Sequence, residues 1–72
     1  MKLNYYPDTD SMYIDLSEDP STESREISEG ILLDYNNEGK LVGIDIDNAR
    51  NKIELSRFVL SNLPGKIETD VA

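Results

Sequence analysis

The clearest pattern in the sequence is an alternation of apolar and polar residues between residues 30 and 47. An apolar run at 31–35 is followed by the turn sequence Asn-Asn-Glu-Gly at 36–39 and by a second run at 41–46. In the second run, apolar residues alternate with glycine or aspartate: Val42, Ile44 and Ile46 with Gly43, Asp45 and Asp47. Because successive strand residues face opposite sides of a sheet, the segment predicts a hairpin with one apolar and one acidic face.

A second hairpin is predicted at the start of the chain. Residues 1–6 have the character of a strand that Pro7 ends, because proline has no N–H to donate to a neighbouring strand. The Pro-Asp-Thr-Asp sequence at 7–10 is typical of a turn. The strand predicted over 11–17 again has two different faces: Met12, Ile14 and Leu16 share one, and Tyr13 and Asp15 share the other.

Residues 22–28 predict a polar strand at a sheet edge. Ile27 is the single apolar residue of this segment, which also carries two glutamates and an arginine. Charged side chains on an edge strand discourage pairing with other chains, so an edge position suits this composition.

The helical pattern lies in the C-terminal third of the chain. Asn51 followed by Glu54 resembles a capping box, in which side chains satisfy the free N–H groups of a first helical turn. Apolar residues then recur at helical spacing: Leu55, Phe58, Val59 and Leu63. The Pro-Gly pair at 64–65 would end this helix, and Ser56 is an alternative start one turn later.

These elements predict one α+β domain over residues 1–64, with a flexible tail at 65–72. We expect an antiparallel β-meander of four to five strands, with the C-terminal helix packed on one face, because the apolar face of a sheet needs a second layer. One ambiguity concerns Ile-Leu-Leu at 31–33, where a shift of one residue would exchange the two faces.

Chain length and composition predict self-association. A chain of 72 residues buries only about 60% of its unfolded surface, and this chain has neither cysteine nor histidine. Small domains without disulfides often gain stability as oligomers, so we expect a homo-oligomer, in the simplest form a dimer. The sequence has no candidate transmembrane helix or signal peptide, and a cytoplasmic location is expected.

The charge distribution restricts the partners. The net charge is −8, and residues 1–47 alone carry twelve acids and three bases. Phosphate backbones and anionic membranes repel such a surface, so we expect neither direct nucleic-acid binding nor membrane binding. A basic protein partner would be attracted. The alternative is that the acidity only keeps a small protein in solution.

The acidic face of the predicted sheet is the candidate partner-binding surface. If the strands pair in simple register, its candidate contact residues are Tyr13, Asp15, Asp34, Leu41 and Asp45. The alternative is an ordinary solvated face with scattered apolar residues. Gly43, in the middle of a strand, indicates a bulge or a close approach to the backbone, or else a weak point without purpose.

Two pairs of aspartates are candidate ligands for a divalent metal: Asp8 with Asp10, and Asp45 with Asp47. Turn capping explains the first pair equally well, and a solvated strand end explains the second. The sequence lacks the further ligands of a calcium loop, so no metal and no cofactor is assigned. Without histidine, cysteine or a glycine-rich phosphate loop, the sequence favours a protein that is not an enzyme.

Several blocks of the sequence resemble a family of small prokaryotic proteins known as domain of unknown function 2283. The resemblance lies in the opening segment 2–16, in 30–35, in the Glu-Gly turn with 41–46, and in the Asn-Ala-Arg exit at 48–50. It spans roughly residues 2–52 and implies no catalytic residues, because the family has no established activity.

The leading hypothesis is therefore a small acidic module for protein–protein interaction. In size and acidity the protein is similar to the antitoxins of small toxin–antitoxin pairs, which is a likeness of class rather than of motif. The alternative hypothesis is a domain that binds a small ligand or a divalent metal.

Overall fold

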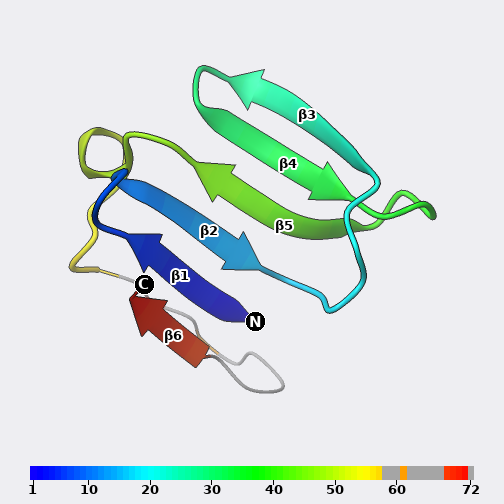
Figure 1. Cartoon of the computed structure of the whole chain (residues 1–72), viewed down its shortest axis with the longest axis horizontal. Coiled ribbons are helices and arrows are strands. Elements are labelled where there is room, and N and C mark those ends of the chain that lie inside the picture. Colours follow the sequence, from blue (N-terminus) through cyan, green and yellow to red (C-terminus); the bar gives the residue numbers. More distant parts are fainter. Residues whose placement is uncertain (58–60, 62–67, 72) are drawn as a thin grey trace.

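The computed structural model describes residues 1–57, 61 and 68–71. Six strands form one sheet in the order β3-β4-β5-β2-β1-β6 (Figure 1). In chain order, the strands are β1 (Lys2–Tyr6), β2 (Ser11–Asp15), β3 (Glu23–Ser28), β4 (Ile31–Tyr35), β5 (Leu41–Ile46) and β6 (Glu68–Val71). Neighbouring strands are antiparallel except β1 and β6, which are parallel.

Both predicted hairpins form, β1 with β2 and β4 with β5. The buried side chain of Asn36 organises the second turn, since its carbonyl oxygen accepts hydrogen bonds from the backbone N–H of Glu38 (2.9 Å) and of Lys40 (3.0 Å). Gly39 has a φ of 82°, a conformation that glycine adopts without steric cost. The turn residues seen in the sequence thus fix the register locally.

The order of the strands differs from the simple meander that was predicted. β5 pairs with β2, which joins the two hairpins into one sheet, and β3 lies at the edge beyond β4. The prediction of an edge strand is confirmed, because β3 has an edge position and all six of its residues are exposed.

The predicted α+β class, with a C-terminal helix packed on the sheet, is wrong. Within the described residues the fold is nearly all β, and their one helical element is a single turn of 3₁₀-helix, η1 (Ala49–Asn51), which precedes the segment expected to be helical. Residues 52–57 continue as turns and bends, while 58–60 and 62–63 lie outside the described residues. No helix of the described part has the length and apolar character needed to cross a membrane.

Contacts with the β1–β2 turn explain why this segment is not an α-helix. The backbone N–H of Ala49 donates to the carbonyl oxygen of Asp10 (2.9 Å), and that of Arg50 donates to the Asp10 carboxylate (3.3 Å). The side-chain nitrogen of Asn51 donates to Oδ1 of Asn48 (2.9 Å), and within the described part of the chain its Oδ1 accepts no backbone N–H, as an N-cap would. Asn48 itself has a φ of 54°, outside the helical region.

β6 lies within the range 65–72 for which a flexible tail was predicted. Its residues pair in parallel with β1, with Glu68 opposite Lys2 and Thr69 opposite Leu3. The sheet is therefore mixed, with β6 as its second edge. The division of the chain at residue 64 stays a prediction.

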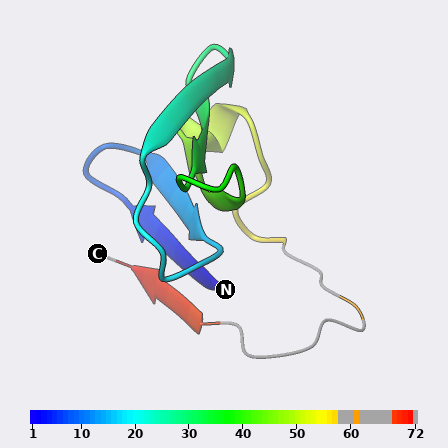
Figure 2. The same cartoon turned by 90° about the vertical axis from the view of Figure 1, so that its right-hand side faces the viewer.

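The strand registers place the side chains in rows across the sheet. Two rows form what we call the apolar face: Leu33, Ile44, Ile14 and Leu3 in one, and Ile31, Ile46, Met12 and Tyr5 in the other. Leu32 pairs with Asp45, which resolves the ambiguity at 31–33 in favour of the expected alternation. Residues 47–57, which follow β5, lie to one side of the sheet (Figure 2). No large side chain of the described part is completely buried, as expected for a core of one sheet layer.

Candidate interaction face

Two further rows of side chains form the polar face of the sheet. From β3 towards β6, the first row holds Ser24, Asp34, Gly43, Asp15, Lys2 and Glu68. The second row holds Glu26, Leu32, Asp45, Tyr13 and Asn4. We call these two rows the polar face. Their residues with described side chains carry five carboxylates and a single amine.

The ring of Tyr13 lies across strand β5. A Cβ atom on Gly43 would overlap with the hydroxyl and the ring of Tyr13, so the ring occupies the space that a side chain at 43 would need. From this position the Tyr13 hydroxyl donates a hydrogen bond to Oδ2 of Asp34 (2.9 Å). The missing side chain at 43 thus allows a residue of β2 to bond with a residue of β4 across the intervening strand.

Asp34 links three strands through its two carboxylate oxygens. Besides the bond from Tyr13, its Oδ1 accepts a hydrogen bond from Oγ of Ser24 on β3 (2.5 Å). Burial raises the pKa of Tyr13 to about 12, with further contributions from the hydrogen bond to Asp34 and from the charges of Asp34, Asp15 and Asp45. At neutral pH the phenol therefore keeps its proton and acts as a donor to Asp34.

The partly buried position of Asp45 disfavours the ionised form of its carboxyl group. Burial raises the pKa of its carboxyl group, and the charges of Asp47 and Asp34 raise it further. Asp45 lies opposite Tyr13 in the pairing of β2 with β5. A positive group placed beside it would offset the like-charge repulsion and favour its ionised form.

A second tyrosine–aspartate pair lies at the β1–β2 turn. The hydroxyl of Tyr5 donates to Oδ1 of Asp10 (2.8 Å). Nε of Arg50 donates to the Tyr5 hydroxyl (3.4 Å) and lies 3.8 Å from Oδ1 of Asp10. An arginine of the same chain therefore completes this pair and joins η1 to the turn.

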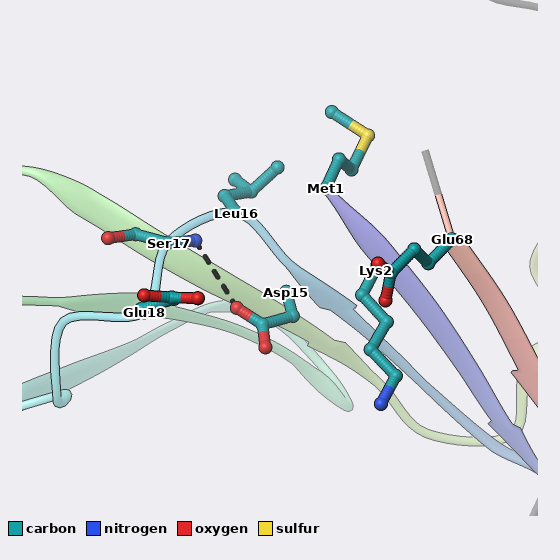
Figure 3. Close-up of a pocket in the computed structure, with 7 residues that line it drawn as sticks. All are labelled: Met1, Lys2, Asp15, Leu16, Ser17, Glu18 and Glu68. Carbon is teal, nitrogen blue, oxygen red and sulfur yellow. Dashed lines mark hydrogen bonds between the residues drawn. The ribbon is translucent and has the colours of Figure 1, made fainter. Parts of the chain in front are cut away.

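An open depression of about 320 Å³ lies beside the first row of the polar face (Figure 3). It is lined by residues at the ends of three strands and by the segment after β2: Met1, Lys2, Asp15, Leu16, Ser17, Glu18 and Glu68. The backbone N–H of Ser17 donates to Oδ1 of Asp15 (3.2 Å), which orients that carboxylate (Figure 3).

The family model described as "Protein of unknown function (DUF2283)" matches residues 2–50. The chain belongs to this family. The match confirms the resemblance seen in the sequence, and the DUF2283 region includes the whole of β1–β5 with the Tyr13–Asp34 pair, whereas β6 lies beyond it. No curated protein and no solved structure matches the chain.

In this DUF2283 protein, four of the five predicted contact residues lie together on the polar face: Tyr13, Asp15, Asp34 and Asp45. Leu41 does not join them, because a register shift between β4 and β5 places it opposite Tyr35. The sequence indicated either a bulge or a close backbone approach at Gly43, and both occur. The register shift begins beside Gly43, and the Tyr13 ring approaches its backbone. The sequence analysis missed Ser24, whose place on this face follows only from the β3–β4 register.

The four aspartates considered as metal ligands do not form a cluster. Among the described residues, no group of three or more histidine, cysteine, aspartate or glutamate side chains is arranged to hold a metal ion. Their positions differ: Asp10 is bonded to Tyr5 and Arg50, Asp45 lies on the polar face, and Asp8 and Asp47 are exposed.

Proposed function

We propose that this protein is a non-enzymatic module that acts by binding another protein, with the polar face as its contact surface. The observation that carries the proposal is the excess of five carboxylates over one amine among the described side chains of that face. A partner with a basic surface would be attracted and oriented by this charge. The absence of histidine and cysteine from the sequence supports a role without catalysis.

The polar face also offers apolar contact area between its charges. The Tyr13 ring covers β5, and Leu32 lies in the same row, so a partner would meet aromatic and aliphatic surface surrounded by carboxylates. Such a mixture is typical of protein interfaces, in which tyrosine is enriched. A specific form of the proposal is an acidic antitoxin that neutralises a basic toxin, and it rests on likeness of size and charge.

The proposal is tested by affinity capture from the native host with matched variants. The double variant Asp34→Asn and Asp45→Asn removes two charges from the polar face, while Asp8→Asn and Glu38→Gln removes two from exposed turns. We expect the wild-type protein and the turn variant to retain the same basic protein, and the face variant to lose it. Equal retention by both variants, or no specific partner for any of them, would contradict the proposal.

Self-association is a separate proposal and uses the other face. The described residues form a single sheet layer, and Ile14, Ile44 and Leu33 on the apolar face are only partly buried. A second copy packed on this face would supply the missing layer and leave the polar face free. Light scattering on the intact protein at micromolar concentration should give the mass of a dimer, and the mass of a monomer would refute this.

The cytoplasmic location also stays a prediction.

The depression beside the polar face favours a second candidate function, the binding of a small cationic ligand. Its lining includes three carboxylates, those of Asp15, Glu18 and Glu68, and one amine side chain, that of Lys2. Calorimetric titration with Mg²⁺, Ca²⁺, Mn²⁺ and a simple diamine tests this alternative. Absence of heat and of any shift in melting temperature would remove it.

A further inference from the structure

The chain contains two tyrosine–aspartate pairs of the same kind. In each, a tyrosine hydroxyl donates to an aspartate carboxylate, from Tyr5 to Asp10 at 2.8 Å and from Tyr13 to Asp34 at 2.9 Å. Because the phenolic proton is directed at the carboxylate, the phenolic oxygen is left as an acceptor beside a negative charge. In the first pair this acceptor is used by Nε of Arg50.

The second pair has no arginine of its own. All three arginines of the chain lie in the described residues, and none is hydrogen-bonded or ion-paired to Tyr13 or Asp34. Arg25 lies over the ring of Tyr35, 5.4 Å from its centre, and pairs with Glu23. The pair on the polar face therefore repeats the arginine-binding arrangement of the β1–β2 turn with the arginine missing.

We propose that the Tyr13–Asp34 pair is the receptor for an arginine side chain of the partner protein. This inference rests on the proposed function and names the group that the polar face recognises. The planar guanidinium has several N–H donors in a fixed fork, so it can bond to the tyrosine oxygen and the carboxylate together. Lysine has a compact charge without this geometry and is a poorer fit.

The surroundings of the pair favour a cation. Asp45 lies opposite Tyr13 in the pairing of β2 with β5, and Asp15 lies two residues further along β2 on the same face. Lys2 is opposite Asp15 and offsets part of the charge on that side, which leaves the side of Asp34 and Asp45 the more negative. The ring of Tyr13 adds an aromatic surface, on which a guanidinium can stack as Arg25 does on Tyr35.

The test compares two capped peptides of equal length and charge, one with arginine and one with lysine at alternate positions between glycines. The dissociation constant of each for the full-length protein is measured from amide shifts in NMR titrations at low salt. We expect the arginine peptide to bind about fivefold more tightly, with the largest shifts around Tyr13 and Asp34. Tyr13→Phe, which keeps the ring, and Asp34→Asn should each abolish this preference.

Tyr35→Phe is the matched control, because that ring already carries Arg25, and it should leave the preference unchanged. Dispersed amide spectra would show that each variant is folded. If the two peptides bind equally well and Asp45→Asn weakens the binding of both, the proposal of an arginine receptor is wrong, whereas the proposal of an acidic contact face stands. Absence of binding by either peptide would overturn both proposals together.

Discussion

Replacement of Gly43 by alanine tests whether the Tyr13 ring depends on the missing side chain beneath it. A Cβ atom at position 43 would overlap with the hydroxyl and the nearest ring carbon of Tyr13. Because Gly43 is buried in a central strand, the backbone cannot easily move away, so the ring must swing out. The hydrogen bond from Tyr13 to Asp34 would then break.

Three contributions set the size of the effect. Alanine is favoured over glycine in a strand by about 0.5–1 kcal/mol. Against this, overpacking costs about 1–3 kcal/mol, and a hydrogen bond to a charged acceptor contributes about 1 kcal/mol where it is partly exposed. We therefore expect Gly43→Ala to lower the free energy of unfolding by about 1–3.5 kcal/mol, which lowers the melting temperature by at least about 4 °C for a domain of this size.

A double-mutant cycle separates this mechanism from a general intolerance of position 43. With Tyr13→Ala as background, the ring is gone, and Gly43→Ala should become stabilising by about 0.5 kcal/mol. Urea unfolding, followed by circular dichroism at one fixed protomer concentration, gives all four stabilities. A coupling energy of about 1.5–4 kcal/mol is expected. If Gly43→Ala is equally destabilising in both backgrounds, the ring does not depend on the space above Gly43.

Three further predictions concern single residues. Asp34→Asn should lower the pKa of Tyr13 from about 12 only part of the way towards the ordinary tyrosine value, because the effect of burial remains. An ultraviolet titration, with the signal of Tyr13→Phe subtracted, measures this pKa. An unchanged value would contradict the contribution assigned to Asp34. Burial and neighbouring charges raise the pKa of Asp45 in the folded protein. The folded state is therefore favoured at low pH, where Asp45 is protonated, and this stability is lost as the pH rises through the raised pKa. Asp45→Asn should therefore raise the melting temperature at neutral pH and not in acid, and an equal change at both would exclude this origin. Asp10→Ala should lower the free energy of unfolding by about 2 kcal/mol, because it removes the acceptor for the Tyr5 hydroxyl and places alanine at a φ of 54°. Urea unfolding measures this, and an unchanged urea midpoint would refute the prediction.

The strands could be predicted because their signals are local. Alternation along 41–46 and the Asn36–Gly39 turn each depend on residues only a few positions apart, and the structure uses them as expected. The pairing of β5 with β2 joins residues about thirty positions apart, and no local pattern specifies it. The same limit explains why the strand order was predicted as a meander.

The helix prediction failed because a local pattern competed with distant contacts. Asn51 and Glu54 have the spacing of a capping box, but the preceding residues are bonded to Asp10, more than 35 positions earlier in the chain. A single cap contributes about 1 kcal/mol. This is less than the two hydrogen bonds donated to Asp10 by the N–H groups of Ala49 and Arg50, together with the Arg50 side-chain contacts, which hold η1 to the turn. Sequence alone identified Asp10 as a turn residue and a candidate metal ligand, and not as a partner of residues 49–50.

The candidate face was predicted more successfully than its chemistry. Four aspartate and tyrosine positions followed from period-two alternation, whereas the bond from Tyr13 to Asp34 required the order β2-β5-β4 and the absence of a side chain at 43. Sequence reasoning marked Gly43 as unusual but could not say which residue would fill the space above it. Conversely, Leu41 was misplaced because the register shift beside Gly43 was not included.

The two tyrosine–aspartate pairs differ in which side of the sheet they occupy, and this decides where an arginine can come from. Tyr5 belongs to a row of the apolar face, so η1, which supplies Arg50, lies on that side. Tyr13 belongs to the polar face, and the sheet itself separates it from η1. Residues 58–60, 62–67 and 72 contain no arginine. Arg57 is described and is not bonded to the pair, so the arginine that completes it comes from another chain. Arg57→Lys should therefore leave arginine-peptide binding unchanged.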